Sequence, residues 1–453
     1  GASARARSAA LVFLLWSRLL RLPGLAVFLA LAFALHPLRV ESVAWVAERR
    51  DVLCGAMFLG ALVAYCRYVE VRTTRSYALV LTLSACALMS KAMAITLPCV
   101  LVLLDAWPLQ RFSREPVRRL VVEKLPIVLL TLPILIVTLL AQEKHPLEEV
   151  PLGYRIETSI VAVMRYLELT VVPHDLAVLY PMPKSWPAIT LVMATVVVVA
   201  GVCAAWFTRR SFPAVAVGLG WFIGMLVPVI GLVSVGRQAY ADRYTYLPSI
   251  GLVIAVAFPA TRFMARGRLH RNATLIVAWM WLGCCAWSTQ EQIGTWTSNE
   301  ALFGNALRVT TDNELAHVQY AKARYALGDF AGALPHLEKA VSLSASAFNY
   351  NRLSLCLLRL GRVDDAVERA IDAVSVEPQS GEFHADLGLA LLERGDIDVG
   401  LRELAIGAQL APTDLRIAAL RADALKKAGR DDEAAAERAR ADAPRATSAA
   451  TPP

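Results

Sequence analysis

The sequence has few charged residues, few cysteines and no CxxC pair. Charged residues make up 19% of the 453 positions, and there are eight cysteines. Disulfide frameworks and structural zinc sites need cysteines at short, regular spacings, so neither is predicted. Most of the cysteines lie in apolar runs, where cysteine acts as a small packing residue. With 57% hydrophobic residues and a mean hydropathy of +0.49, the composition indicates an integral membrane protein.

The excess of basic residues is confined to the first part of the chain. Residues 1–300 contain 28 Lys and Arg against 16 Asp and Glu, whereas residues 301–453 contain 18 against 22. The overall charge of +8 therefore describes neither part, and we predict no nucleic-acid partner. We expect a multi-span membrane domain over residues 1–295, a soluble domain over 296–440 and a disordered tail over 441–453.

The start of the chain lacks an initiator methionine and a cleavable signal peptide. A hydrophobic run begins almost at once, at residues 9–20, and has the pattern of the end of a later membrane helix. We therefore expect a truncated sequence, with a first membrane helix and its loop upstream of residue 1.

Hydrophobic segments predict the membrane bundle. Several are shorter than the roughly 20 residues that a simple span needs, which favours irregular helices packed against one another. The candidate segments are 9–20, 22–35, 52–66, 77–90, 92–107, 125–141, 188–208, 213–235, 248–261 and 273–288.

Basic loops predict the orientation of these segments, because cytoplasmic loops are enriched in Lys and Arg. Placing the five basic groups between Arg18 and Arg271 in the cytoplasm puts 16 basic residues there and 9 in the opposite loops. This requires that 77–107 enters and returns as a hairpin turning near Ser90 and Lys91, and that 156–172 lies on the outer surface. The C-terminal domain is then outside, on the periplasmic side if the membrane is a bacterial inner membrane.

An internal repeat occupies the last third of the chain. Gly328, Gly361, Gly395 and Gly429 are 33 or 34 residues apart, and small residues follow each glycine at fixed offsets. This period resembles tetratricopeptide repeats, in which two helices are joined by a glycine turn. We expect three full repeats and a partial, polar fourth. Such stacks usually bind a peptide or protein; the alternative is that they only pack on the membrane domain.

The stretch "HPLRVESVAWVAERRDVL", residues 36–53, places charges between two apolar segments. Glu41, Trp45 and Glu48 share one face at helical spacing, which predicts an amphipathic helix on the outer membrane surface, with His36 near its start. One interpretation is a polar patch that orients a substrate or a metal. The other is a solvated face with ordinary Glu–Arg pairs, which the spacing alone favours.

Two further groups of ionisable residues are candidates for function, because charges near a membrane are costly. Lys91 lies among apolar neighbours and needs an anion, either a carboxylate or a phosphate, unless it reaches the interface. In "SVGRQAYADRYTYLPS", residues 234–249, two arginines lie among tyrosines and an aspartate. They are suited to clamping a lipid-borne phosphate, or to forming an aromatic belt with an Asp–Arg pair.

Other polar residues have weaker signals. Asp105 lies near the cytoplasmic exit of its segment and is interpreted as structural. His174 and Asp175 lie in a proline-rich outer loop, without an evident partner. The sequon at Asn272 falls on the inner side and is interpreted as accidental.

The chain resembles the transmembrane and tetratricopeptide repeat-containing O-mannosyltransferase family, in particular its bacterial-type members. The resemblance rests on "HPLRVESVAWVAERRDVL", "SKAMAITLPCVLVLLDAWPLQR", "PHDLAVLYPMP" and "ADRYTYLPSIGL", followed by the repeats. It implies an all-α fold, in which a polytopic GT-C-like membrane bundle precedes a tetratricopeptide solenoid. It also implies transfer of a sugar from a polyprenyl-phosphate donor to Ser or Thr of an acceptor protein on the outer face.

The resemblance assigns roles to the candidate residues. His36 and Glu41 are the expected catalytic residues, orienting the acceptor or a metal. The donor phosphate is assigned to Lys91, Arg237, Arg243 and Tyr246, and supporting roles to Glu48, Asp51 and Asp242. The family's first acidic motif follows its first membrane helix, so that catalytic carboxylate is expected upstream of residue 1.

Two other functions fit the same sequence. The chain can be a non-catalytic membrane scaffold whose repeats recruit a partner. It can also be a transporter, but its charged candidates gather at one face instead of running through the membrane, which disfavours transport. An acidic pair encoded upstream, after one further membrane helix, would favour the enzyme over the scaffold. Metal dependence, the sugar, the acceptor and the oligomeric state are left open.

Overall fold

A computed structural model describes residues 2–142, 151–231 and 238–442 of the chain. These residues form two compact units, Gly1–Thr310 and Thr311–Pro453, and each is described by itself. Both are helical, and β1 (Tyr180–Pro181) and β2 (Gln238–Tyr240) form one small antiparallel sheet in the first unit. The sequence placed the domain boundary between residues 295 and 296; here the helix Asn299–Val309 belongs to the first unit.

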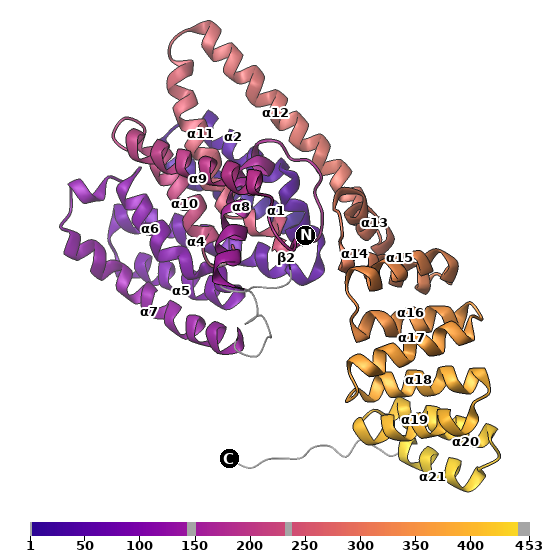
Figure 1. The fold of residues 1–453 in the computed structure, drawn as a ribbon. Coiled ribbons are helices and arrows are strands. Elements are labelled where there is room, and N and C mark those ends of the chain that lie inside the picture. The colour runs from indigo at the N-terminus through magenta and orange to yellow at the C-terminus, as the bar shows by residue number, and fades with distance from the viewer. Residues whose placement is uncertain (1, 143–150, 232–237, 443–453) are drawn as a thin grey trace. The chain divides into compact units, whose positions relative to one another are not determined.

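The first unit is a bundle of helices of unequal length (Figure 1). Its helices are α1 (Ala2–Leu20), α2 (Pro23–Leu35), α3 (Val40–Ala44), α4 (Arg49–Val71), α5 (Thr74–Ser90), α6 (Leu97–Ala106), α7 (Val117–Gln142), α8 (Leu152–Val171), α9 (Ala188–Thr208), α10 (Pro213–Leu226), α11 (Pro248–Met264), α12 (Arg268–Thr295) and α13 (Asn299–Val309). Short 3-10 turns connect several of them: η1 (Pro37–Arg39), η2 (Val46–Glu48), η3 (Ala92–Thr96), η4 (Arg111–Ser113) and η6 (Asp242–Thr245).

Three stretches of helix in the described part of the chain are long and apolar enough to cross a membrane. They are Val46–Val71, Val117–Thr138 and Ala188–Thr208, and the pair Pro23–Leu35 and Pro37–Ala44, bent by 59°, is a fourth if it forms one broken span. The apolar helices Ala92–Ala106, Pro213–Leu226 and Pro248–Met264 are shorter than a span. The chain is therefore a membrane protein with irregular helices, as the lengths of its hydrophobic segments predicted.

The amphipathic helix that was predicted to carry Glu41, Trp45 and Glu48 on one face is not continuous, and that prediction was wrong. The backbone of His36 is extended, with ψ of 131°, and that of Trp45 is extended, with ψ of 116°, so the stretch divides into η1, α3 and η2 before α4 begins at Arg49. The breaks turn Glu41 and Glu48 inward, where each is less than 5% exposed. The carboxylates therefore lie in the protein and not on a solvated face.

Three tryptophans mark the centre of the bundle. The ring of Trp16 lies 6.3 Å from that of Trp107 and 6.3 Å from that of Trp221, and these rings join α1, the end of α6 and α10. All three side chains are buried. Aromatic groups of this size dominate the packing of a core, so this contact fixes the relative positions of helices that are distant in sequence.

Helices α10 and α11 approach each other most closely at two glycines. A Cβ atom built on Gly218 would lie 2.3 Å from the carbonyl oxygen of Gly251, and one built on Gly251 would lie 2.5 Å from that of Gly218. Small residues at such crossings let helix backbones pack directly in membranes.

We expect Gly218→Ala to destabilise the bundle by about 1–3 kcal/mol, because its methyl group overpacks the crossing. Gly224→Ala, in the same helix and with no atom within 4 Å of the added carbon, is the matched control. It should leave stability unchanged or raise it slightly, since alanine favours helix. Thermal unfolding of the purified protein measures both, and equal effects of the two substitutions would contradict the role of the crossing.

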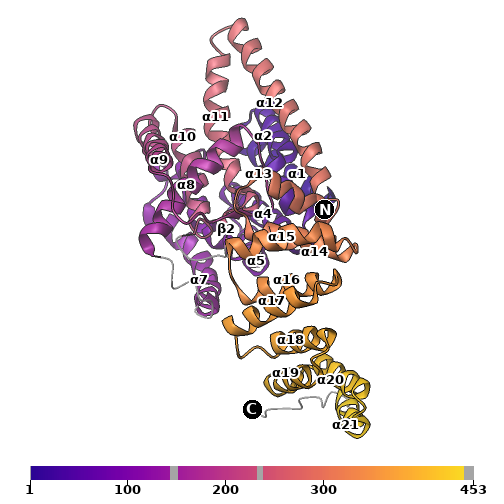
Figure 2. The ribbon, with the colours of Figure 1, turned by 45° about the vertical axis from the view of Figure 1, so that its right-hand side comes forward.

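The second unit stacks antiparallel helix pairs (Figures 1 and 2). Its helices are α14 (Glu314–Ala326), α15 (Phe330–Leu343), α16 (Ala347–Arg359), α17 (Val363–Val376), α18 (Gly381–Arg394), α19 (Ile397–Leu410), α20 (Leu415–Lys427) and α21 (Asp431–Asp442). The fourth pair, α20 and α21, is complete, although the sequence predicted only a partial repeat. The unit is a tetratricopeptide-type solenoid.

The repeated glycines form the turns within these pairs. Gly328, Gly361, Gly395 and Gly429 have φ of 79°, 74°, 98° and 73°, in the left-handed region that glycine adopts without strain. Each follows the first helix of its pair, which ends there, and the second helix begins within two residues. The repeat of glycine every 33 or 34 residues is therefore explained by the positive φ that each turn requires.

Candidate functional site

Glu41 and Arg243 join two of the motifs that the sequence singled out. The side chain of Glu41, in α3, is 3% exposed. One carboxylate oxygen, Oε2, accepts a hydrogen bond of 2.8 Å from the backbone N–H of Arg243 in η6, and the other, Oε1, pairs with Nη1 of the same arginine. These residues are 202 positions apart. The pair therefore holds α3, from one of these motifs, against η6, from the other.

Three more charged side chains extend this pair into a chain of alternating charges. Arg243 Nε lies 3.6 Å from Glu48 Oε1, and Lys91 Nζ lies 3.3 Å from Glu48 Oε2. Lys91 also pairs with Asp51 Oδ1. We call Glu41, Arg243, Glu48, Lys91 and Asp51 the paired-charge cluster. Its three carboxylates and two cations alone leave one net negative charge, and the exposed Arg50, whose Nη2 lies 3.4 Å from Glu48 Oε1, offsets it from outside the cluster.

Lys91 is held in place by its position at the end of a helix. It is the C-cap of α5, and its extended backbone, with φ of −159° and ψ of 137°, separates α5 from η3. Its ammonium group also lies 6.0 Å from the ring centre of Tyr244. Of the two anions that the sequence allowed for Lys91, the structure places carboxylates beside it.

Asp242 lies beside the cluster and is tied to the proline-rich loop. Its Oδ1 accepts a hydrogen bond of 3.0 Å from the hydroxyl of Tyr180, and that hydroxyl accepts one from the backbone N–H of Ala177. Burial, followed by the nearby Glu41 carboxylate, raises the pKa of Asp242 well above its usual range, and the Tyr180 hydrogen bond opposes this shift.

Arg39 is a buried cation with unused donors. The side chain is 1% exposed, and its Nη2 donates to Thr245 Oγ1 at 2.8 Å. Its Nε and Nη1 have no hydrogen-bond partner in the described part of the protein. Instead, the guanidinium lies 5.7 Å from the ring centre of Phe33 and 5.5 Å from that of Tyr246. An anion with oxygen atoms would satisfy these donors without breaking an existing ion pair.

His36 has a different position from the one expected of a catalytic group. One ring nitrogen, Nε2, lies 3.0 Å from the backbone oxygen of Thr170, and the other, Nδ1, accepts from the backbone N–H of Leu38 at 3.3 Å. Nε2 thus contacts the backbone of α8, and Nδ1 contacts the backbone of η1. In this arrangement neither is available to a substrate, and Glu41 pairs with Arg243 instead.

The remaining predicted residues are divided between the site and its surroundings. Tyr246 contributes its ring to the Arg39 contact, and Glu48 and Asp51 belong to the paired-charge cluster. Arg237 lies outside the described residues. His174 contacts the carboxylates of Glu168 and Asp175 on the surface of the same unit. No group of three or more His, Cys, Asp or Glu side chains suited to a metal ion occurs within the described ranges.

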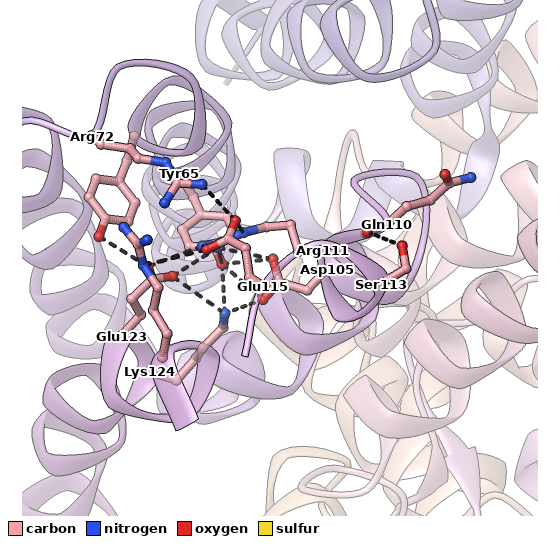
Figure 3. A network of polar contacts seen from close by, with 11 residues as sticks. Tyr65, Arg72, Asp105, Gln110, Arg111, Ser113, Glu115, Glu123 and Lys124 are labelled. Atoms are coloured by element: carbon pink, nitrogen blue, oxygen red, sulfur yellow. Dashed lines mark hydrogen bonds and ion pairs between the residues drawn. The ribbon is translucent and has the colours of Figure 1, made fainter. Parts of the chain in front are cut away.

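A second buried network surrounds Asp105 (Figure 3). Asp105 is fully buried; it accepts a hydrogen bond from the Tyr65 hydroxyl at 2.8 Å and pairs with Lys124 and Arg111. Arg111 also binds Glu115, and this hydrogen bond is the main cause that lowers the pKa of Glu115 to about 2. The network connects α4, α6 and α7, in keeping with the structural role that the sequence assigned to Asp105.

Sequence reasoning missed Arg39, Tyr180 and the members of the Asp105 network other than Asp105. Arg39 stands within "HPLRVES", but nothing in the spacing distinguishes it from Arg49 or Arg50. Tyr65 comes from α4, Arg111 from η4 and Lys124 from α7. Only the fold brings them together with Asp105, because the contacts among these four residues span 6 to 59 positions of sequence.

These features define an all-α membrane protein with a tetratricopeptide-type solenoid and a buried cluster of paired charges. The chain is similar to Protein O-mannosyl-transferase TMTC1 of Homo sapiens, with 25% identity over 396 residues, which cover 72% of this chain and 43% of that protein. It is also similar to Protein O-mannosyl-transferase TMTC1 of Mus musculus, with 28% identity over 166 residues, which cover 35% of this chain and 18% of that protein. The chain spans less than half the length of these curated relatives. No protein-family model matches it.

Among solved structures, the chain has partial similarity to repeat proteins. A crystal structure of MamA matches with a TM-score of 0.29 and 20% identity, covering 31% of this chain and 84% of that one. YrrB, described as a TPR protein with an unusual peptide-binding site, matches with a TM-score of 0.28 and 17% identity, covering 31% of this chain and 74% of that one.

Proposed function

We propose that this protein is a membrane glycosyltransferase of the GT-C type. It transfers a sugar, mannose in the first instance, from a polyprenyl-phosphate donor to a Ser or Thr hydroxyl of a protein on the outer face of a bacterial inner membrane. The main support is the convergence of three separate motifs on the paired-charge cluster, with Glu41 and Arg243 in direct contact. The similarity to curated O-mannosyltransferases supports the same reaction class.

The donor phosphate would bind between Arg39 and Arg243. Arg39 offers unused N–H groups, and Tyr246 covers its guanidinium, whereas Lys91 is already occupied by Glu48 and Asp51. A phosphate that attracts Arg243 would loosen its pair with Glu41. The carboxylate could then orient the acceptor hydroxyl, while the two guanidinium groups stabilise the charge that develops on the leaving phosphate.

The repeats would recruit the acceptor protein. Stacked helix pairs present an extended surface that is suited to binding a peptide. Polar groups are also built into this unit: Asn351 donates to Asp386 at 2.9 Å, and both side chains are less than 5% exposed. The alternative, a non-catalytic scaffold, would use only this part of the molecule.

A transfer assay tests the proposal. The full-length protein is incubated in membranes with polyprenyl-phosphate mannose and candidate acceptor proteins, and glycopeptides are identified by mass spectrometry. Glu41→Gln should lower transfer about 100-fold, a typical contribution of a positioned acid–base group. Glu70→Gln, at an exposed position of α4, is the control and should keep full transfer. Full transfer by Glu41→Gln would contradict the assigned site, and partner binding without any transfer would support the scaffold.

A further inference from the structure

A groove between α6 and α7 lies apart from the paired-charge cluster and is not used by the proposed reaction. Its volume is about 420 Å³. Cys99 and Val102 of α6 line one side, Val121, Leu125 and Val128 of α7 line the other, and Phe112 of η4 closes one end. Almost all of its surface is apolar.

The two charged residues at this groove are not available to a ligand. Asp105 and Lys124 also line it, but they pair with each other, and Tyr65 and Arg111 complete their contacts (Figure 3). The groove therefore presents apolar walls to whatever enters it. Its outer positions are exposed, with Val121 at 59% and Leu125 at 50%, on a helix that is long and apolar enough to cross a membrane. An apolar chain is the occupant that this surface suits.

Basic residues lie in the segment between two residues that line the groove. Phe112 and Leu120 both line the groove, and the segment between them contains Arg114, Arg118 and Arg119, with Glu115 as its acidic residue. Glu115 is already held by Arg111 and Arg72. Arg114 and Arg118 are exposed, and no ion pair is recorded for either within the described residues. Two free guanidinium groups beside the end of a membrane helix attract an anionic headgroup.

We propose that this groove binds an anionic membrane phospholipid, with one acyl chain between α6 and α7 and the headgroup phosphate at Arg114 and Arg118. The apolar groove binds the acyl chain. The two exposed arginines next to it favour an anionic headgroup over a zwitterionic one. Bidentate contacts of arginine with phosphate oxygens fix the headgroup. The acyl chain packs against the apolar walls of the groove.

Cys99 reports occupancy of the groove. It is exposed and lines the groove, whereas the exposed Cys86 in α5 and Cys203 in α9 lie outside it. The intact protein is placed in lipid nanodiscs of phosphatidylcholine alone or with phosphatidylglycerol. Modification by N-ethylmaleimide is then followed at each cysteine by peptide mass spectrometry. We expect phosphatidylglycerol to slow the modification of Cys99 several-fold and to leave Cys86 and Cys203 unchanged.

Two variants separate the headgroup from the chain. Arg114→Gln/Arg118→Gln should abolish the slowing at Cys99, whereas the control Arg209→Gln/Arg210→Gln, which removes two exposed arginines elsewhere, should keep it. Val121→Trp fills the groove and keeps both arginines. It should reduce the phosphatidylglycerol that is retained in native mass spectrometry several-fold.

Four results would overturn the proposal. One is an equal effect of phosphatidylglycerol on all exposed cysteines, and another is slowing at Cys99 that persists without Arg114 and Arg118. The third is stronger protection by a polyprenyl phosphate than by phosphatidylglycerol, which would identify the groove as a donor-lipid site. Inorganic phosphate without a chain should give no protection, and protection by it would also contradict a chain-filled groove.

Discussion

Asp105→Asn is expected to destabilise the membrane unit by about 3–5 kcal/mol, because it removes the carboxylate that faces two buried cations. Asp105 is fully buried, Lys124 is 5% exposed and Arg111 is 2% exposed. The asparagine can still accept from Tyr65, but it carries no charge to balance Lys124. Loss of one partner of a buried pair leaves the other charge desolvated, which is much more costly than the pair itself is stabilising.

The double variant Asp105→Asn/Lys124→Met is the matched comparison. It removes one charge of each sign, so the net charge of the network is unchanged, and methionine keeps a long apolar side chain in place of the lysine stem. We expect it to recover most of the stability lost in Asp105→Asn, since replacing a buried ion pair by apolar groups is often neutral. Lys184→Met, at an exposed position of a loop, controls for the loss of a lysine.

Unfolding of the purified protein by heat, or by increasing concentrations of a denaturing detergent, measures these differences in stability. Within the described residues, Asp105 and Lys124 make no recorded contact with the members of the paired-charge cluster, so transfer activity of the folded fraction should be retained. A double variant as unstable as Asp105→Asn would show that Asp105 acts through contacts other than the pair with Lys124. In that case the Tyr65 hydrogen bond would be the first candidate.

The repeats were the most predictable part of the fold. The glycine period and the small residues at fixed offsets are local signals, and each glycine adopts the positive φ that a tight turn requires. Only the completeness of the last pair was missed. Its second helix, α21, has no apolar residue larger than alanine, so the hydrophobic pattern that marks the earlier helices is weak there.

The membrane segments were predictable by length and composition, but the path between them was not. Periodicity placed Glu41, Trp45 and Glu48 on one face of a single helix, although the chain breaks at His36 and again at Trp45. Pro37 signals the first break, and no residue signals the second. The two breaks allow Glu41 to contact Arg243 and Glu48 to contact Lys91. These contacts span 202 and 43 positions, so no local sequence pattern predicts them.

The candidate site was predicted as a set of residues, but not as an arrangement. Glu41, Glu48, Asp51, Lys91 and Arg243 were selected from three stretches, and the fold brings all five together. The family resemblance assigned these cations to the donor phosphate, whereas Lys91 and Arg243 pair with carboxylates here. Which charges pair depends on which of them are buried together. Arg39 was missed because only the structure shows that its Nε and Nη1 have no acceptor among the described residues.

Arg243→Gln is expected to destabilise the protein by about 3–5 kcal/mol, because Glu41 is then left buried without its cation. The backbone N–H of residue 243 still donates to Glu41, but one hydrogen bond does not balance a desolvated charge. Glu48 also loses a neighbouring cation, although Lys91 remains beside it. The same substitution should lower sugar transfer about 100-fold or more in the full-length protein, as expected for loss of a group that stabilises a developing oxyanion.

Glu41→Gln/Arg243→Gln separates these two effects. It removes one charge of each sign, leaves Glu48, Lys91 and Asp51 in place, and keeps the net charge of the cluster at −1. Stability should therefore return nearly to that of the unmodified protein, as judged by thermal unfolding. Transfer should stay at the level of Arg243→Gln or below it, because both the phosphate ligand and the acceptor-orienting carboxylate are lost. Recovery of transfer together with stability would mean that the pair only holds α3 against η6, and the donor site would then have to be sought around Arg39.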